Sequence, residues 1–136
     1  MLVICLGRAT TPDAITFHIA IVEDDPRLRS ILSLVLTSEG YSVTSFVDAE
    51  TALAAFLLQA PSVLLLDQML PGMTGLELLR RLRSHGLRCP VLMITALQDP
   101  AFDRHAIAAG ADAVLGKPFD VDRLLAWVLP QQPQAG

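Results

Sequence analysis

Short aliphatic runs alternate along the chain with longer segments in which apolar residues recur every three or four positions. Near-continuous apolar runs are typical of strands that are covered on both faces, as in a parallel sheet. The spacing in the longer segments is that of amphipathic helices. The pattern therefore predicts five strands, over residues 18–22, 41–46, 63–66, 91–94 and 113–115.

Residues that favour helix starts and stops bound the segments between these strands. Asp25 suits an N-cap with Pro26 at the first helical position, and Gly40 suits the stop of that helix. The apolar spacing predicts that one face of each helix packs on the core, with Ile31 in the first helix and Ile107 in the fourth. The five helices are expected over residues 26–39, from 48 through 57, from 74 or 75 to about 86, over 101–109 and over about 121–129.

The regular alternation of strands and helices predicts an α/β fold. Right-handed crossovers between parallel strands place helices on both sides of the sheet, which gives a doubly wound five-stranded (βα)5 architecture. The chain has 136 residues, of which 52% are hydrophobic, so it is long and apolar enough for a single domain with one substantial core.

Composition and charge argue against several classes of function. The formal net charge is -4 and the basic residues are scattered, so we expect no direct contact with nucleic acid. The longest apolar region, residues 52–66, contains polar residues and a proline and is too short to span a membrane. Cys5 and Cys89 lack the spacing of metal ligands, and we expect them to be reduced thiols in a cytoplasmic protein.

Most of the candidate chemistry comes directly after the predicted strands. Glu23 and Asp24 follow the first strand, Asp67 follows the third, Thr95 the fourth, and Lys117 lies just beyond the fifth. In doubly wound sheets, ligands bind outside the carboxyl ends of the strands. We therefore expect three acids, a hydroxyl and an ammonium group to meet at one rim of the sheet.

Carboxylates that meet in this way repel one another, and a hard divalent cation relieves the repulsion. Mg²⁺ needs only one or two carboxylates and keeps water ligands that a phosphate donor can replace. A carboxylate beside the metal can act as a nucleophile and accept a phosphoryl group as an aspartyl phosphate. On this interpretation Asp67 is the nucleophile, and Thr95 and Lys117 would bind the phosphoryl oxygens.

Four motifs follow one another along the chain, and together they are very hard to obtain by chance. They are VEDD at 22–25, DQMLPGMTG at 67–75, TA at 95–96 and GADAVLGKPF at 110–119. In this order the motifs resemble the receiver domain of two-component response regulators, over residues 18–129. The resemblance implies the flavodoxin-like receiver fold, with strand order 2-1-3-4-5.

The resemblance also implies a metal site. Asp24 would bind Mg²⁺ directly, together with Asp67 and the backbone carbonyl of Met69. Glu23 would act largely through a bound water. Asp25 falls one position beyond the acidic pair of the family, so we interpret it as the helix cap.

For the phosphoryl group, the resemblance implies that Asp67 is the phosphoacceptor. Thr95 would contact the phosphoryl group and move inward on activation, and Lys117 would pair with it. In the family, the bond that corresponds to Lys117–Pro118 is a cis peptide bond, which is otherwise a minority state.

The partners implied by the resemblance are proteins. A sensor histidine kinase or a histidine phosphotransfer protein would donate the phosphoryl group, and a downstream protein or a fused output domain would receive the signal. Such a domain is a switch and not an enzyme with an external product, and many receivers form homodimers through the face of the fourth and fifth helices. Residues 17–129 would form the receiver domain, 1–16 an N-terminal extension without a family counterpart, and 130–136 a tail or linker.

Position 114 departs from the family pattern. In many receivers an aromatic residue three positions before the lysine swings inward when the threonine moves, whereas this chain has Val114. Valine has a stiff χ1 torsion and offers little rotameric signal. An alternative interpretation is therefore a pseudo-receiver, a protein-binding module that works without phosphorylation.

Two further alternatives fit the residues less well. A metal-dependent phosphohydrolase with an aspartyl nucleophile would carry a second acid two residues after it, where this chain has Met69. A nucleotide or flavin binder would need a glycine-rich phosphate loop after the first strand, and residues 23–25 are acidic instead.

Overall fold

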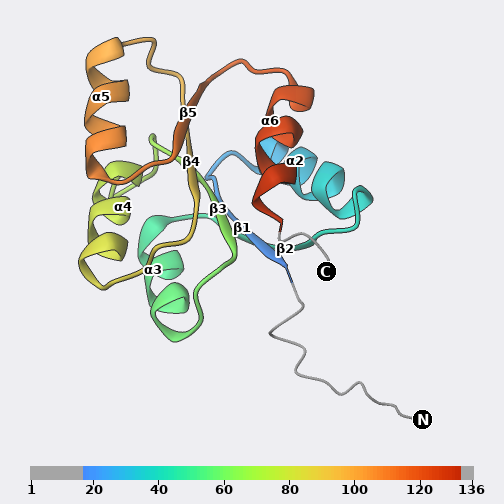
Figure 1. Ribbon diagram of the computed structural model, residues 1–136, viewed down its shortest axis with the longest axis horizontal. Coiled ribbons are helices and arrows are strands. Elements are labelled where there is room, and N and C mark those ends of the chain that lie inside the picture. Colours follow the sequence, from blue (N-terminus) through green and yellow to red (C-terminus); the bar gives the residue numbers. More distant parts are fainter. Residues whose placement is uncertain (1–16, 133–136) are drawn as a thin grey trace.

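A five-stranded parallel sheet lies between two layers of helices in the computed structural model, which describes residues 17–132 (Figure 1). The strand order is β2-β1-β3-β4-β5, so the expected doubly wound fold and its order are confirmed. The predictions for residues 1–16, including Cys5, and for 133–136 lie outside the described residues. The strands are β1 His18–Val22, β2 Ser42–Phe46, β3 Val63–Asp67, β4 Val91–Thr95 and β5 Ala113–Gly116.

The helices begin where the sequence offers a side-chain cap. Asp25, Asp48 and Asp99 each accept a hydrogen bond from a backbone N–H in the first turn of the helix that follows. Gly110 ends the fourth helix with φ at 117°, a left-handed conformation that glycine adopts without strain. The helices are α2 Pro26–Ser38, α3 Ala49–Leu58, α4 Gly75–Ser84, α5 Pro100–Ala109, α6 Val121–Val128 and the short 3-10 helix η1 Leu129–Gln131.

Alternate residues of each central strand face opposite layers. On β1, Ala20 and Val22 belong to the core beneath α3, α4 and α5, whereas Ile19 and Ile21 belong to the core beneath α2 and α6. Figure 1 shows the two helix layers on either side of the sheet. The near-continuous apolar character of β1, β3 and β4 follows from this double burial.

Two parts of the predicted core are wrong. The side chains of Ile31 on α2 and Ile107 on α5 are 51% and 50% exposed, because the apolar stripe of each helix is wider than the face that the sheet covers. β2 is an edge strand that pairs only with β1, and none of its residues is fully buried. Helical spacing identifies an apolar face, but it does not tell how much of that face another element covers.

Parallel pairing in register aligns the ends of the central strands. Val22 lies opposite Leu66, Asp67 opposite Ile94, and Thr95 opposite Gly116. The residues that follow β1, β3, β4 and β5 therefore share one rim of the sheet, as the sequence predicts.

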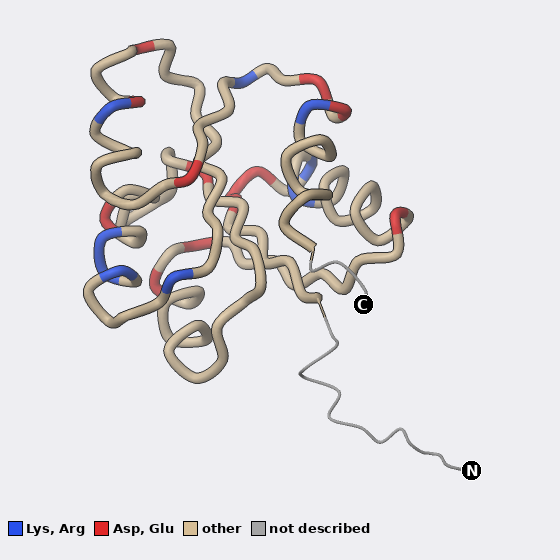
Figure 2. The backbone as a smooth tube through the Cα atoms, in the orientation of Figure 1, with Lys and Arg blue, Asp and Glu red and all other residues tan. Residues whose placement is uncertain are grey.

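Within residues 17–132, no helix is long and apolar enough to cross a membrane. Cys89 is a free cysteine, partly buried beside the core. Figure 2 shows Lys and Arg on several separate elements, with the largest group on α4 and the turn that follows it. The absence of direct nucleic-acid contacts stays a prediction.

Candidate functional site

Two carboxylates are buried at the rim of the sheet. Glu23 follows β1 and is 1% exposed, and Asp67 is the last residue of β3 and is 2% exposed. A buried carboxylate is costly unless it is hydrogen-bonded and paired with a cation. The surroundings of these two acids therefore decide what the site can do.

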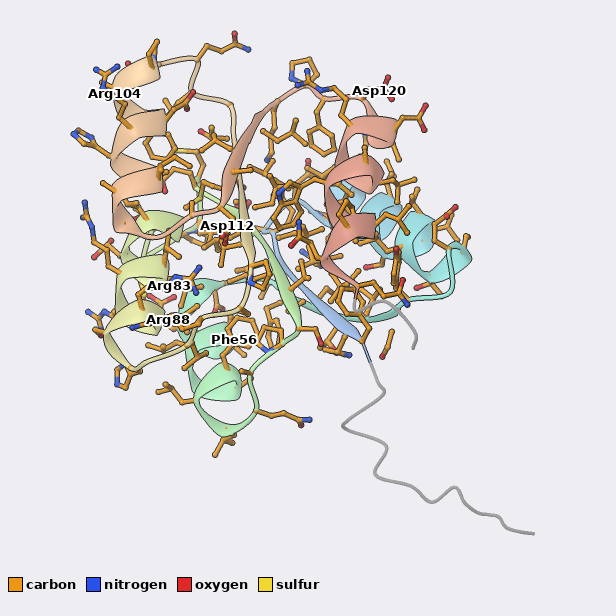
Figure 3. The ribbon with its side chains drawn as sticks, viewed as in Figure 1. Phe56, Arg83, Arg88, Arg104, Asp112 and Asp120 are labelled. Atoms are coloured by element: carbon orange, nitrogen blue, oxygen red, sulfur yellow. The ribbon has the colours of Figure 1, made fainter. Side chains whose placement is uncertain are left out.

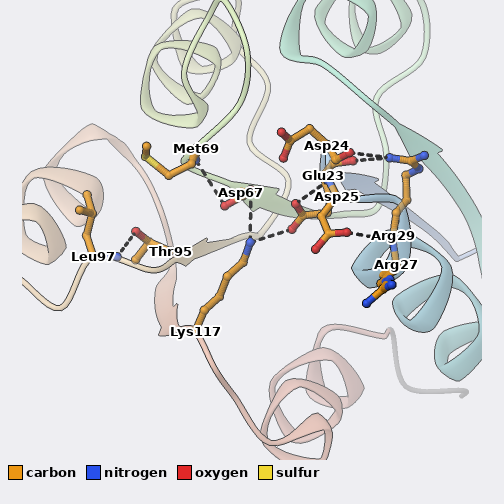
Figure 4. A network of polar contacts seen from close by, with 10 residues as sticks. All are labelled: Glu23, Asp24, Asp25, Arg27, Arg29, Asp67, Met69, Thr95, Leu97 and Lys117. Carbon is orange, nitrogen blue, oxygen red and sulfur yellow. Dashed lines mark hydrogen bonds and ion pairs between the residues drawn. The ribbon is translucent and has the colours of Figure 1, made fainter.

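One ammonium group serves both acids. Lys117 follows β5, and its Nζ lies 3.0 Å from Glu23 Oε1 and 3.3 Å from Asp67 Oδ2 (Figure 4). The Lys117–Pro118 peptide bond is cis, as the family resemblance implies. Within this group two carboxylates share a single positive charge, so the pair is not neutralised when both acids are ionised.

The pKa values of Glu23 and of Lys117 are both raised in this cluster. Burial raises the pKa of Glu23 to about 7, although the hydrogen bonds from Lys117 and from the Asp25 N–H oppose the rise. Burial alone would lower the pKa of Lys117, but the hydrogen bond to Glu23 and the charges of both acids outweigh it and raise that pKa. The two acids therefore favour the charged form of Lys117, whereas the single charge of Lys117 does not balance the two negative charges of the ionised acids.

A third acid completes a cluster that suits a divalent metal. Asp24 is exposed, and carboxylate oxygens of Glu23, Asp24 and Asp67 lie within 4.8 Å of one another. All three donors are oxygen atoms, which is the ligand type that Mg²⁺ prefers. Met69, whose carbonyl is the expected fourth protein ligand, is 59% exposed next to Asp67, and its N–H donates to Asp67 Oδ1 at 3.3 Å. The donor set therefore fits Mg²⁺.

Thr95 lies at the same rim, and its hydroxyl oxygen accepts a hydrogen bond from the loop that follows β4. The residue is fully buried, and Thr95 Oγ1 accepts a hydrogen bond from the Leu97 N–H at 2.9 Å (Figure 4). Its carbonyl accepts from the Lys117 N–H at 2.7 Å, which ties the ends of β4 and β5 together. Among the described residues, the Thr95 hydroxyl has no hydrogen bond to Asp67.

The backbone of the acidic pair is held from the first helix. Arg29 Nη1 donates to the carbonyl of Glu23 at 2.8 Å and to that of Asp24 at 3.3 Å. Asp25 caps α2 by accepting from the Arg27 N–H at 2.9 Å, which confirms its interpretation as the helix cap. Arg29 thus holds the backbone of the two acids, and its guanidinium group contacts their backbone carbonyls.

The loop after Asp67, residues 68–74, is folded tightly against the start of α4. The Gln68 side chain accepts from the Leu76 N–H at 2.8 Å, and the Gln68 carbonyl accepts from the Gly75 N–H at 3.1 Å. A Cβ atom at position 75 would collide with the Asp67 carbonyl, so only glycine allows this approach. The loop therefore leaves the strand end in a defined direction.

The structure brings together Glu23, Asp24, Asp67 and Lys117, and it positions Thr95 and Met69 next to them. Their roles in metal binding and phosphoryl transfer stay predictions. Sequence reasoning missed the backbone contacts of Arg29, and it also missed Glu50, whose carboxylate accepts from the Met73 N–H. Neither contact has a sequence signal, since both join residues on different elements.

The fold and the site together define a class of protein. It is a doubly wound domain with an acidic cluster and a lysine at the rim where the strands end. The profile of the response regulator receiver domain family matches residues 19–129. The chain therefore belongs to the receiver domain family of response regulators.

Relatives among curated proteins are transcriptional regulators. The chain is 40% identical over 119 residues to the uncharacterized transcriptional regulatory protein YkoG of Bacillus subtilis, covering 88% of this chain and 52% of YkoG. It is 41% identical over 110 residues to the transcriptional regulatory protein TcrA of Mycobacterium tuberculosis, covering 80% of this chain and 43% of TcrA. The chain thus spans about half the length of the curated relatives it matches.

Solved structures agree with this assignment over nearly their whole length. A response regulator structure from Chloroflexus aurantiacus superposes with a TM-score of 0.80 at 34% identity, covering 88% of this chain and 99% of the other. The BeF3-activated N-terminal receiver domain of RstA from Klebsiella pneumoniae superposes with a TM-score of 0.80 at 27% identity, covering 86% of this chain and 99% of the other. Both neighbours share the receiver fold.

Proposed function

We propose that this chain is a phosphorylatable receiver of a two-component phosphorelay, in which Asp67 accepts a phosphoryl group in the presence of Mg²⁺. The observation that carries the proposal is the shared ammonium group: Glu23 and Asp67 are both buried, and Lys117 is the partner of both. A buried excess of negative charge is unfavourable for stability alone. It is expected where a divalent cation and a phosphoryl group bind.

Different residues of the site would bind the metal, accept the phosphoryl group and pair with it. Glu23, Asp24, Asp67 and the Met69 carbonyl would hold Mg²⁺, which when bound neutralises phosphoryl oxygens. An Asp67 carboxylate oxygen forms a bond to phosphorus while the bond from phosphorus to the donor histidine nitrogen breaks. Lys117 is close enough to Asp67 to pair with the transferred group.

Thr95 would report the transfer to the rest of the domain. Its hydroxyl oxygen accepts from the Leu97 N–H, and the hydroxyl proton stays available to donate to a phosphoryl oxygen on Asp67. An inward movement of Thr95 toward that oxygen would carry the Leu97 N–H with it and so move the loop that precedes α5. Because position 114 is valine, the readout would be carried by this loop and not by an aromatic rotamer.

The partners follow from the same proposal. The donor would be a sensor histidine kinase or a phosphotransfer protein, and the chain would act as a cytoplasmic switch and not as an enzyme with its own product. The transcriptional regulators it resembles are about twice as long as the matched region, which supports a fused output domain as the receiver of the signal. The candidate assembly is a homodimer through the face of α5 and α6, which many receivers form.

Intact-mass spectrometry after incubation with acetyl phosphate and Mg²⁺ tests the proposal. We expect one phosphoryl adduct on the wild type and on Asp103→Ala, which removes an exposed acid of α5, and none on Asp67→Ala or without metal. No adduct on folded wild type under any condition would overturn the proposal. That result would favour the phosphorylation-independent binding module.

A further inference from the structure

The first half of the loop that carries Met69 is attached to the neighbouring strand β4 and to α4. The Gln68 N–H donates to the Ile94 carbonyl at 3.0 Å, and the Gln68 side chain is bonded to α4. Leu70 is 8% exposed and packs into the core beneath α3, α4 and α5. These contacts fix where the loop starts, but they leave the position of its outer half open.

The outer half is held from a different helix. The Met73 N–H donates to Glu50 Oε2 at 2.9 Å. Glu50 lies in the first turn of α3, which follows the edge strand β2, so the contact joins two elements 23 residues apart in sequence. Among residues 17–132, Glu50 is the one side chain from outside β3 and α4 that bonds to this loop.

The fit of the loop around this carboxylate gives a second, independent observation. Gly72 has φ at +73°, and a Cβ atom built there would lie 2.7 Å from Glu50 Oε2. The loop backbone therefore lies directly against the carboxylate, with no room for a side chain between them. The described residues provide no ion pair for Glu50, so the hydrogen bond to Met73 is its specific partner.

We infer that Glu50 is a positioning residue for the metal site: by holding Met73, it keeps the Met69 carbonyl where it can bind Mg²⁺, and so sets the affinity for the metal. The Met69 carbonyl belongs to the peptide unit whose N–H, that of Leu70, donates to the Gln68 carbonyl at 3.1 Å, so a displacement of the outer half would reach this carbonyl through Leu70. The inference rests on the proposed function, because it takes the Met69 carbonyl as a metal ligand.

A pair of substitutions separates the hydrogen bond from the charge. Glu50→Ala removes both the acceptor and one negative charge, whereas Glu50→Gln removes the same charge and keeps an oxygen that can accept from Met73. Glu39→Ala, at the far end of α2, removes the same charge from an exposed position away from the loop. The three variants together distinguish a positioning role from an electrostatic one.

The primary measurement is the Mg²⁺ dissociation constant by calorimetry, and the second is hydrogen exchange of the Met73 amide by NMR. We expect Glu50→Ala to raise the dissociation constant about 3- to 10-fold, less than the ~10- to 100-fold cost of removing a group bonded directly to a metal ligand. The same variant should exchange the Met73 amide faster. Glu50→Gln and Glu39→Ala should stay within about 2-fold of wild type in both readouts.

Gly72→Ala provides an independent route to the same effect. The added methyl group displaces the Glu50 carboxylate, and a φ of +73° strains any residue that has a side chain, so we expect weaker Mg²⁺ binding and faster Met73 exchange than in wild type. Combined with Glu50→Ala, its effect on the dissociation constant should be smaller than the product of the two separate fold changes, because both act on one contact.

Three results would overturn the inference: equal Mg²⁺ affinity in Glu50→Ala and wild type, a Glu50→Gln variant as weak as Glu50→Ala, or Gly72→Ala and Glu50→Ala effects that multiply. The failure of the proposed function would look different. A wild type that binds no Mg²⁺ would remove the metal site altogether, even if Met73 exchange still showed that Glu50 holds the loop.

Discussion

The two ends of strand β5 carry polar clusters of opposite character. After its carboxyl end lies the acid site, which we define as Glu23, Asp67 and Lys117. Before its amino end lies the arginine clamp, which we define as Arg83, Gly110 and Asp112 (Figure 3). Both clusters tie separate elements together, but they treat charge differently.

The contacts of the arginine clamp give backbone groups side-chain partners, and its two charged side chains carry opposite charges. Arg83 Nη2 and Nε donate to the Gly110 carbonyl at 2.7 and 3.2 Å, and Nη1 donates to the Leu87 carbonyl at 2.9 Å. Asp112 accepts from the Val91 N–H at 2.8 Å and is half exposed. One cation and one anion thus join the end of α5 to the starts of β4 and β5 with no charge left over.

The charges of the acid site do not balance, because two buried carboxylates share one ammonium group. This difference teaches how to tell a structural cluster from a functional one in a fold of this kind. We expect the clamp to stabilise the metal-free protein and the acid site to lower its stability, a loss that bound Mg²⁺ would recover. The predictions that follow test this contrast.

The largest effect on function is expected for Asp67→Asn. It should abolish the phosphoryl adduct, and it should also stabilise the metal-free protein by about 1–2 kcal/mol, because one of two like charges beside Lys117 disappears. Urea denaturation in EDTA, with and without added Mg²⁺, measures the second effect. A variant less stable than wild type without metal would show that the acid site is not under electrostatic stress.

Arg83→Ala should act in the opposite direction. Its loss leaves the Gly110 carbonyl without its donor and the Leu87 carbonyl with Arg88 Nη1 alone, and it breaks the ion pair with Asp112, which together should reduce the free energy of unfolding by about 3 kcal/mol. Arg80→Ala, an exposed position on the same helix, should change it by less than about 0.5 kcal/mol. Phosphorylation of Asp67 should persist in both variants, and its loss in Arg83→Ala would mean that the clamp is part of the switch.

The pH dependence of stability should separate the two clusters next. The pKa of Glu23 rises from 4.5 to about 7 on folding, so between these values the folded protein keeps a proton that the unfolded chain has lost. The free energy of unfolding should therefore fall as pH rises from about 4.5 to 7, by about 3 kcal/mol, and level off above that range.

Chemical denaturation in EDTA across this pH range gives the measurement, with Glu23→Gln as the control. The control should lack this decline, since it has no proton to lose. The same decline in both proteins would assign it to other groups and not to the acid site.

The smallest effect is expected at Asp112. Asp112→Ala removes the acceptor of the Val91 N–H and should cost about 1 kcal/mol, whereas Asp112→Asn keeps an acceptor oxygen and should cost less than half of that. Thermal unfolding of the two variants measures the difference. Equal losses would point to the charge and its 3.5 Å contact with Arg83 as the important feature.

Local signals in the sequence predicted the elements and the acid site well. The Asp25–Pro26 start of α2 and the Gly110 end of α5 lie where they were expected, because caps and left-handed stops depend on adjacent residues. The acids and Lys117 were found because each follows a strand, and parallel pairing brings such positions to one rim. The predicted core positions Ile31 and Ile107 were wrong, since hydrophobicity alone does not tell which face is covered.

The sequence by itself determined the order of strands and helices, the family, and the residue types at the site, because these depend on short-range spacing and on motifs. Only the tertiary structure decided that Lys117 serves two buried acids, that the Thr95 hydroxyl is bonded to Leu97, and that Glu50 holds the loop after Asp67. Most of these contacts join elements far apart in the chain. All depend on side-chain packing, because differences of a few tenths of an ångström decide whether such a contact forms. Such distances follow from how the layers pack, which no local pattern encodes.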